Sequence, residues 1–281
     1  MKVFKIEIIS LAFWIFLLCL NLTYTQSIAN PLPVYETKFG GFLPNEDYSC
    51  SMPNASVLIE IDATDPYSYF GLVFTGNYTI FNPNDSLNLT IAAPFTKNIF
   101  GLDSNCTIKI NNSVIPHDVV RYPWNESYTW DDYIMIYNRN LIVCNLSLPK
   151  NKSILLEYNF KTNLESLLRD VSYLNFIYDI GTAAVWEGKI SETVEFRVIG
   201  RLPDSHSNDP MIMEILNGKS FIWEFKNVEI PPGLLSVYIS YLGDYEYNWF
   251  KISLGYFFLI FLLLGFISLI ILQRRIISIK W

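Results

Sequence analysis

The sequence predicts a mainly β protein: an Ig-like β-sandwich ectodomain, of one or two packed domains, and a C-terminal transmembrane helix. Short segments alternate apolar and polar residues, with turn signals every 8 to 15 residues, which is typical of a β-sandwich. Aromatic residues make up 16% of the chain and favour strands. One uncharged apolar stretch, residues 252–272, is long enough to cross a bilayer as a helix.

Residues 1–25 predict a secretory signal peptide. Two lysines precede the apolar run 8–20, and Thr23 and Thr25 then suit cleavage before Gln26. An acidic residue at the edge of the run is unusual for a signal peptide. The alternative is an uncleaved N-terminal anchor, which would leave the ectodomain outside and tethered at both ends.

The ectodomain divides by pattern into three predicted regions: a linker or edge segment at 26–47, a glycosylated β-sandwich at 48–161 and a membrane-proximal β region at 162–248. Strands are expected near 56–62, 70–82, 87–93, 106–110, 114–120, 133–137, 141–148, 153–161, 173–179, 190–199, 211–216, 220–226 and 234–241. Thr162 and Glu165 match a capping box and predict a short helix between the two halves. Asn217-Gly218 predicts a two-residue hairpin turn.

The C-terminal region predicts how the chain is oriented in the membrane. The transmembrane helix is predicted at 249–272, and Arg274 and Arg275 follow it. Positive charge beside a span stays cytoplasmic, so the tail 273–281 is expected inside and the ectodomain outside. The chain is therefore predicted to be a type I single-pass protein of the cell membrane. The eight residues 243–250 reach at most about 28 Å, which places the second half of the ectodomain near the bilayer.

Asn-x-Ser/Thr triplets are concentrated in the first half of the ectodomain. Residues 26–151 contain 16 asparagines, for which chance predicts about two triplets, and nine occur. The predicted glycosylation sites are Asn54, Asn77, Asn84, Asn88, Asn105, Asn111, Asn125, Asn145 and Asn151. They fall on polar strand faces or in turns, where sugar can project into water. Residues 152–248 have no such triplet.

Three cysteines follow the predicted signal peptide: Cys50, Cys106 and Cys144. An extracellular location permits disulfides, and Cys106 and Cys144 both lie on apolar strand faces. A Cys106–Cys144 disulfide is the simplest pairing, with Cys50 bonded to either cysteine, or no bond, as alternatives. The spacing lacks Cys-x-x-Cys, and the chain has only two histidines, which argues against a zinc site.

No pattern predicts catalysis, a cofactor or a metal, and we expect the protein not to be an enzyme. His117 and His206 lie in polar, turn-like contexts without a metalloprotease or nucleophile-elbow motif. The acidic segments 131–132 and 204–210 could bind calcium but read more simply as solvated turns. Gly218-Lys219-Ser220 is not a P-loop, because its first glycine would fall on Met213. The net charge of −7 gives no basic surface for nucleic acid.

The stretch 178–190 has the form Tyr-x-x-Gly-Thr-x-x-x-Trp-x-Gly-x-Ile. It resembles a segment of uncharacterised prokaryotic and archaeal cell-surface or secreted β-domains. The resemblance covers thirteen residues and implies a β-sandwich without an assigned activity. From the residues themselves, Gly181 and Gly188 allow tight turns, and Trp186 is expected to fill the core rather than to stack on sugar.

These patterns leave three functional hypotheses. The first is a glycosylated cell-surface protein with a binding or scaffolding ectodomain, whose protein partner meets the unglycosylated membrane-proximal region. The second is an accessory subunit of a larger membrane complex. The third is a membrane-tethered extracellular hydrolase, which would need a cleft with paired acids.

Overall fold

The computed structural model describes residues 23–29, 32–36, 42–44, 49–96, 106–121, 139–165, 168, 173–230 and 235–243. The predicted apolar run 8–20 and the predicted transmembrane helix 249–272 lie outside these residues. Within the described part of the chain, no helix has the length and apolar character that crossing a membrane requires. The predicted strand at 133–137 is also outside it.

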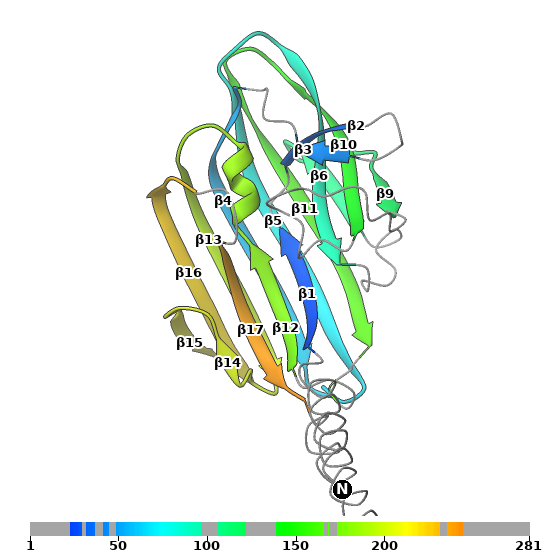
Figure 1. The fold of residues 1–281 in the computed structure, drawn as a ribbon, viewed down its shortest axis with the longest axis vertical. Coiled ribbons are helices and arrows are strands. Elements are labelled where there is room, and N and C mark those ends of the chain that lie inside the picture. The colour runs from blue at the N-terminus through cyan, green and yellow to red at the C-terminus, as the bar shows by residue number, and fades with distance from the viewer. Residues whose placement is uncertain are drawn as a thin grey trace, which may run out of the picture.

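The described chain is mainly β and forms two sheets that pack face to face (Figure 1). In strand order, one sheet contains β14 (Ser205–His206), β17 (Ser236–Leu242), β12 (Tyr173–Asp179), β1 (Thr23–Ala29), β6 (Leu87–Thr96), β10 (Arg139–Leu148) and β9 (Asp118–Arg121). In that sheet, β2 (Leu32–Glu36) also pairs with β6, and β3 (Phe42–Pro44) with β2.

The second sheet contains β15 (Met211–Ile215), β16 (Gly218–Val228), β13 (Ile190–Gly200), β4 (Ser51–Ala63), β5 (Tyr69–Asn82), β11 (Lys152–Glu165), β7 (Cys106–Ile110) and β8 (Ser113–Ile115). A short 3₁₀ helix, η1 (Gly181–Val185), connects β12 to β13. Strands from before and after residue 162 belong to both sheets. The segment predicted as a linker, 26–47, contributes β2, β3 and most of β1, and β1 begins at Thr23, in the last residues of the predicted signal peptide.

Alternation along the strands builds the core between the sheets. In β5, every second residue from Phe70 to Asn82 is buried, while the residues between them face outward. Aromatic rings bridge the two layers, because Phe70 on β5 lies 5.4 Å from Phe176 on β12, centroid to centroid. The hydroxyls of Tyr78 and Tyr178 also meet between the sheets, with their oxygens 3.2 Å apart. Both sheets therefore share one core.

The predicted helix does not begin at the capping box, because residues 162–165 form the end of β11; most of residues 166–172 lie outside the described chain. Residues 162–165 continue the antiparallel ladder of β11 with β5, from Thr162 opposite Leu72 to Glu165 opposite Tyr69. Thr162 and Leu164 are buried while Lys161 and Asn163 are exposed, so the side chains follow a period of two. The capping box is a local signal only, and pairing with a long neighbouring strand satisfies the same backbone groups.

Two other predictions change in detail. The strand expected at 114–120 is divided into β8 and β9, and Pro116 lies in the gap between them. The hairpin between β15 and β16 is confirmed, but Ile215 pairs with Gly218, so the turn residues are Leu216 and Asn217. Asn217 has φ 61°, the left-handed conformation that the turn requires and that Asn tolerates.

Candidate functional site: a pocket and an exposed edge strand

Seven of the nine predicted glycosylation sites lie in the described residues; Asn105 and Asn125 do not. Six of the seven are exposed, and the other, Asn77, is half-buried on the outer face of β5. Asn145 accepts a hydrogen bond from Thr90 Oγ1 across two strands, at 2.9 Å. Glycosylation stays a prediction, and each described acceptor has a side chain that reaches the surface.

The three predicted cysteines are buried, and all three are free thiols in the structure. Cys106 on β7 and Cys144 on β10 come from opposite sheets, so the predicted inward orientation is confirmed. The predicted Cys106–Cys144 disulfide is not formed here. Instead, Cys144 Sγ lies 3.4 Å from the Tyr158 hydroxyl. Burial, with a smaller effect of Cys144, raises the pKa of the Cys106 thiol to about 12, and burial raises that of Cys144 to about 11.

The histidines and acidic segments identified in the sequence do not form a common site in the described residues. His117 lies in the gap between β8 and β9, and His206 lies on β14, at the other sheet edge. No group of three metal-ligating side chains occurs in the described residues. The acidic segment 131–132 is outside these residues. In the segment 204–210, Asp204 Oδ2 accepts hydrogen bonds from Arg201, at 3.2 Å, and from the Leu242 backbone N–H, at 2.7 Å. This carboxylate therefore has a structural role.

The stretch 178–190 also has a structural role. Trp186 is buried in the core, as expected, at the end of η1. Gly188 has φ +85°, in agreement with the expected tight turn. Just before η1, Asp179 Oδ1 accepts a hydrogen bond from Gly181 N at 2.7 Å. Asp179 is only 3% exposed, and burial raises its pKa to about 7, although the bond to Gly181 acts in the opposite direction.

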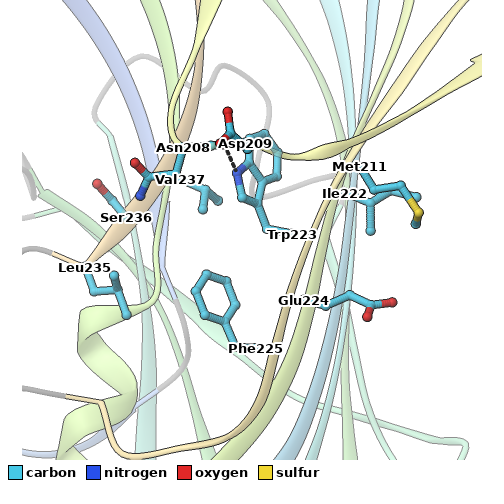
Figure 2. Close-up of a pocket in the computed structure, with 10 residues that line it drawn as sticks. All are labelled: Asn208, Asp209, Met211, Ile222, Trp223, Glu224, Phe225, Leu235, Ser236 and Val237. Atoms are coloured by element: carbon cyan, nitrogen blue, oxygen red, sulfur yellow. Dashed lines mark hydrogen bonds between the residues drawn. The ribbon is translucent and has the colours of Figure 1, made fainter.

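A pocket of about 270 Å³ opens at the edge of the sandwich, between β16 of one sheet and the start of β17 of the other. Its lining residues are Asn208, Asp209, Met211, Ile222, Trp223, Glu224, Phe225, Leu235, Ser236 and Val237. The Trp223 and Phe225 rings point from β16 toward the segment with Leu235 and Val237 (Figure 2). The segment 207–210 crosses between the sheets beside them. The pocket therefore has an apolar floor at an open side of the sandwich.

Trp223 fixes the shape of this pocket. Its indole N–H donates to the carbonyls of Ser207, at 3.2 Å, and Asn208, at 3.0 Å. Its ring meets Phe196 edge-on, with centroids 5.7 Å apart. The indole N–H has both of its acceptors within the protein, and the ring is packed against Phe196. The indole is therefore held in one orientation, and the crossing segment 207–210 is held against β16.

Acidic and amide groups surround the apolar floor. Asp209 and Glu224 carry the only charges among the lining residues, and both are negative. The Glu224 carboxylate points away from the Asp209 side of the pocket (Figure 2) and forms an ion pair with Lys226 at 2.6 Å. The two acids therefore do not face each other across the cavity as a hydrolytic pair would. The arrangement suits an apolar group with a neutral or cationic neighbour.

Strand β15 adjoins the pocket through Met211 and exposes apolar side chains on both faces. Met211, Ile212 and Met213 are 53%, 47% and 49% exposed. We call these three residues the edge patch. Among the described strands, β15 pairs only with β16, so its other side is a free edge of the sheet. A free edge presents unpaired backbone N–H and C=O groups that another chain can bind.

Sequence reasoning located these strands but not the site. Phe221, Trp223 and Phe225 alternate on one face, which indicates an inward-facing aromatic row. Which of these rings borders a cavity depends on the opposite sheet and on the crossing segment. The first three residues of β15, 211–213, are apolar without alternation, as in a strand buried on both faces. The structure instead leaves both faces in water, and this contrast is the signal that could have identified the patch.

Comparison with known proteins adds information on the fold. No protein-family model and no curated protein matches the chain. A candidate nutrient-binding protein of Legionella pneumophila superposes with a TM-score of 0.54 and 16% identity, over 80% of this chain and 76% of that one. At this identity the likeness shows a shared fold only.

Two weaker similarities are to larger enzymes. An M1 zinc metallopeptidase of Deinococcus radiodurans has a TM-score of 0.38 at 10% identity, over 68% of this chain and 42% of that one. Leukotriene A4 hydrolase of Saccharomyces cerevisiae has a TM-score of 0.35 at 11% identity, and the match spans only 29% of that protein. This chain thus spans less than half the length of either enzyme.

Proposed function

We propose that this chain is a glycosylated, type I single-pass protein of the cell surface whose Ig-like sandwich binds a protein partner. The observation that carries the proposal is the edge patch on β15 beside the pocket at Trp223. Both features belong to residues 152–248, the part of the ectodomain without glycosylation triplets. The predicted signal sequence, the triplets before residue 152 and the apolar segment 249–272 support the location.

The edge patch lacks the residues that usually protect the exposed edge of a sheet from pairing with another chain. Edge strands normally carry lysine, proline or inward charge, which prevents association. The only charged side chain of β15 is Glu214, and its carboxylate forms an ion pair with Lys219 at 2.9 Å. Methionine side chains are flexible and polarisable and adapt to varied partners. The strand therefore suits addition of an extended segment of the partner, with backbone hydrogen bonds along β15.

The pocket supplies a place for an anchoring side chain. Apolar anchors that fill preformed pockets contribute much of the binding energy in protein interfaces. The pocket has an aromatic floor and two acids among its lining residues. We therefore expect the partner segment to place an apolar side chain there, next to a basic residue.

The test compares the two edges of one sheet. A photo-crosslinking amino acid is placed at Ile212 on β15 or at Val114 on β8, the opposite edge, where the side chain is 68% exposed. In cells, the Ile212 probe should crosslink a partner and the Val114 probe should not. Met213→Glu should weaken that complex about tenfold, since it removes about 1 to 2 kcal/mol of apolar burial. Equal crosslinking from both edges, or none from Ile212, would refute the proposal.

A second candidate function is the binding of a small apolar ligand in the pocket itself. The pocket volume of about 270 Å³ favours it, as does the shared fold with a candidate nutrient-binding protein. Phe225→Ala should then abolish ligand-induced thermal stabilisation, whereas Met213→Glu should leave it unchanged. A protein partner predicts that both variants weaken binding.

A further inference from the structure

The first and last described strands leave the sandwich at the same end. Thr23, where β1 starts, is in register with Tyr173 of β12, which is in register with Leu242 near the end of β17. The starts of β1 and β12 and the end of β17 therefore lie side by side at the lower end of the molecule (Figure 1). The described chain ends at residue 243 at this end, six residues before the start of the predicted transmembrane helix.

Exposed apolar side chains gather at the same end. Twelve large hydrophobic residues of the described chain are exposed, and six of them lie here. We call these six the anchor-end surface: Tyr67, Tyr69, Tyr173, Leu202, Leu216 and Leu242. They come from separate strand ends and turns, including the β15–β16 turn, where Leu216 is 86% exposed. The sandwich thus has an apolar end at which the chain continues toward the predicted transmembrane helix.

Arg201 connects the parts of this surface. Its guanidinium donates to the Tyr67 hydroxyl at 3.4 Å and lies 5.8 Å from the centre of the Tyr67 ring. It also donates to the Leu242 carbonyl at 3.1 Å and to Asp204 at 3.2 Å. These bonds join the turn between β4 and β5 to the strand that leads toward residue 249.

Two basic side chains lie at this end in the part of the chain that the structure describes, and each is paired with an acid. Arg201 pairs with Asp204, and Lys219 pairs with Glu214. Asp62 Oδ1 accepts hydrogen bonds from the backbone N–H and the hydroxyl of Thr64. The described residues of this end therefore form no uncompensated basic cluster of the kind that anionic lipid selects.

We propose that the anchor-end surface contacts the headgroup region of a zwitterionic bilayer, so that the ectodomain rests on the membrane end-on. The inference relies on the membrane anchor of the proposed function. Tyrosine rings favour the membrane interface, where the phenol is wet and the ring is apolar. Leucines at strand ends add apolar area. The eight residues 243–250 allow this end to lie at most about 28 Å from the predicted helix.

The position of the predicted glycans agrees with this orientation. Asn84 and Asn151 lie in the turns after β5 and after β10, and Asn54 lies near the start of β4, at the opposite end. Sugar at these sites would point away from the bilayer. The competing explanation is that a protein partner covers this end. An experiment on the purified chain in lipid, where no partner is present, distinguishes lipid contact from partner contact.

The experiment uses the full chain in phosphatidylcholine nanodiscs, with Cys19→Ser so that the remaining native cysteines are the three buried ones. A fluorophore is attached at Leu202→Cys, or at the exposed control Val114→Cys on β8. Lipids with a nitroxide near the headgroup should quench the probe at 202 at least about twofold and leave the probe at 114 unchanged. The same quenching is expected when anionic lipid is added.

A second variant tests whether the quenching comes from contact of the anchor-end surface with lipid or only from tethering by the transmembrane helix. Tyr67→Ser, Leu216→Ser and Leu242→Ser together should reduce the quenching at position 202, while the chain still incorporates into nanodiscs. Quenching that is absent, or unchanged in this variant, would overturn the lipid contact and leave the anchor intact. Failure of the chain to incorporate would instead overturn the anchor, and with it the proposed function.

Discussion

Asp179 should make the stability of the sandwich fall as the pH rises from about 4 to about 7. The folded carboxyl is buried and has a pKa of about 7, against 3.8 for an ordinary aspartate. Between these values the folded chain holds a proton that the unfolded chain releases. The stability associated with the protonated group is therefore complete below pH 3.8 and is lost as the pH rises through 7.

The magnitude follows from the two pKa values. A tenfold change in proton affinity corresponds to about 1.4 kcal/mol, so the free energy of unfolding should fall by on the order of 4 kcal/mol across this range. Asp179→Asn keeps an oxygen to accept the bond from Gly181 N and carries no charge. At pH 4 the free energy of unfolding of the variant should be about 1 to 3 kcal/mol below that of the wild type, because the new amide N–H groups need partners. At pH 8 it should be the more stable protein.

The assay is urea unfolding of both chains in mild detergent, followed by tryptophan fluorescence from pH 4 to pH 8. The difference in unfolding free energy between variant and wild type cancels the titration of all other groups. Asp85→Asn controls for the loss of a carboxylate at the surface, and its difference should stay within about 0.5 kcal/mol. If the Asp179→Asn difference is independent of pH, the carboxyl does not titrate in this range and the reasoning is refuted.

Three further predictions concern thiols, turns and glycans. The buried thiols of Cys106 and Cys144 should resist Ellman's reagent at pH 8 in the reduced folded protein and react after unfolding; rapid labelling before unfolding would contradict their burial. Gly200→Ala should destabilise by more than about 2 kcal/mol, because φ is +90° and the new Cβ would lie 2.5 Å from the Ala63 carbonyl oxygen. Gly188→Ala, with φ +85° and no atom within 4 Å, should cost only about 1 kcal/mol, and equal losses would show that the contact is relieved. Enzymatic removal of N-glycans should increase electrophoretic mobility, and Asn145→Gln should remove one glycan from the ladder; an unchanged ladder would remove Asn145 from the acceptors.

The sequence identified most strands because their side chains alternate strictly. The ranges 106–110 and 173–179 were predicted with the bounds that the structure has. Prediction failed where a local signal competed with a distant partner. The capping box at Thr162 indicates a helix by itself, but pairing with Leu72, ninety positions earlier in the chain, decides the conformation.

The candidate site could not be predicted for a related reason. Trp223 and Phe225 were placed on a strand, but their pocket exists because β17 belongs to the other sheet and the segment 207–210 crosses beside them. The edge position of β15 likewise depends on the order of strands in the sheet. Strand order is a long-range property, and the hydrophobic pattern of one segment carries little information about it.

The same strand order explains how glycans and a binding surface can share one sheet. Asn54 on β4 is the predicted acceptor of this sheet that is closest to β15 in strand order, and β13 and β16 lie between them. Three strand spacings amount to about 14 Å. Register adds a second separation, because Met213 aligns through Ser220 and Arg197 with Glu60, six residues along β4 from Asn54. That is about 20 Å along the strand, so the root of the nearest glycan on this sheet lies well outside the footprint of a strand added to β15.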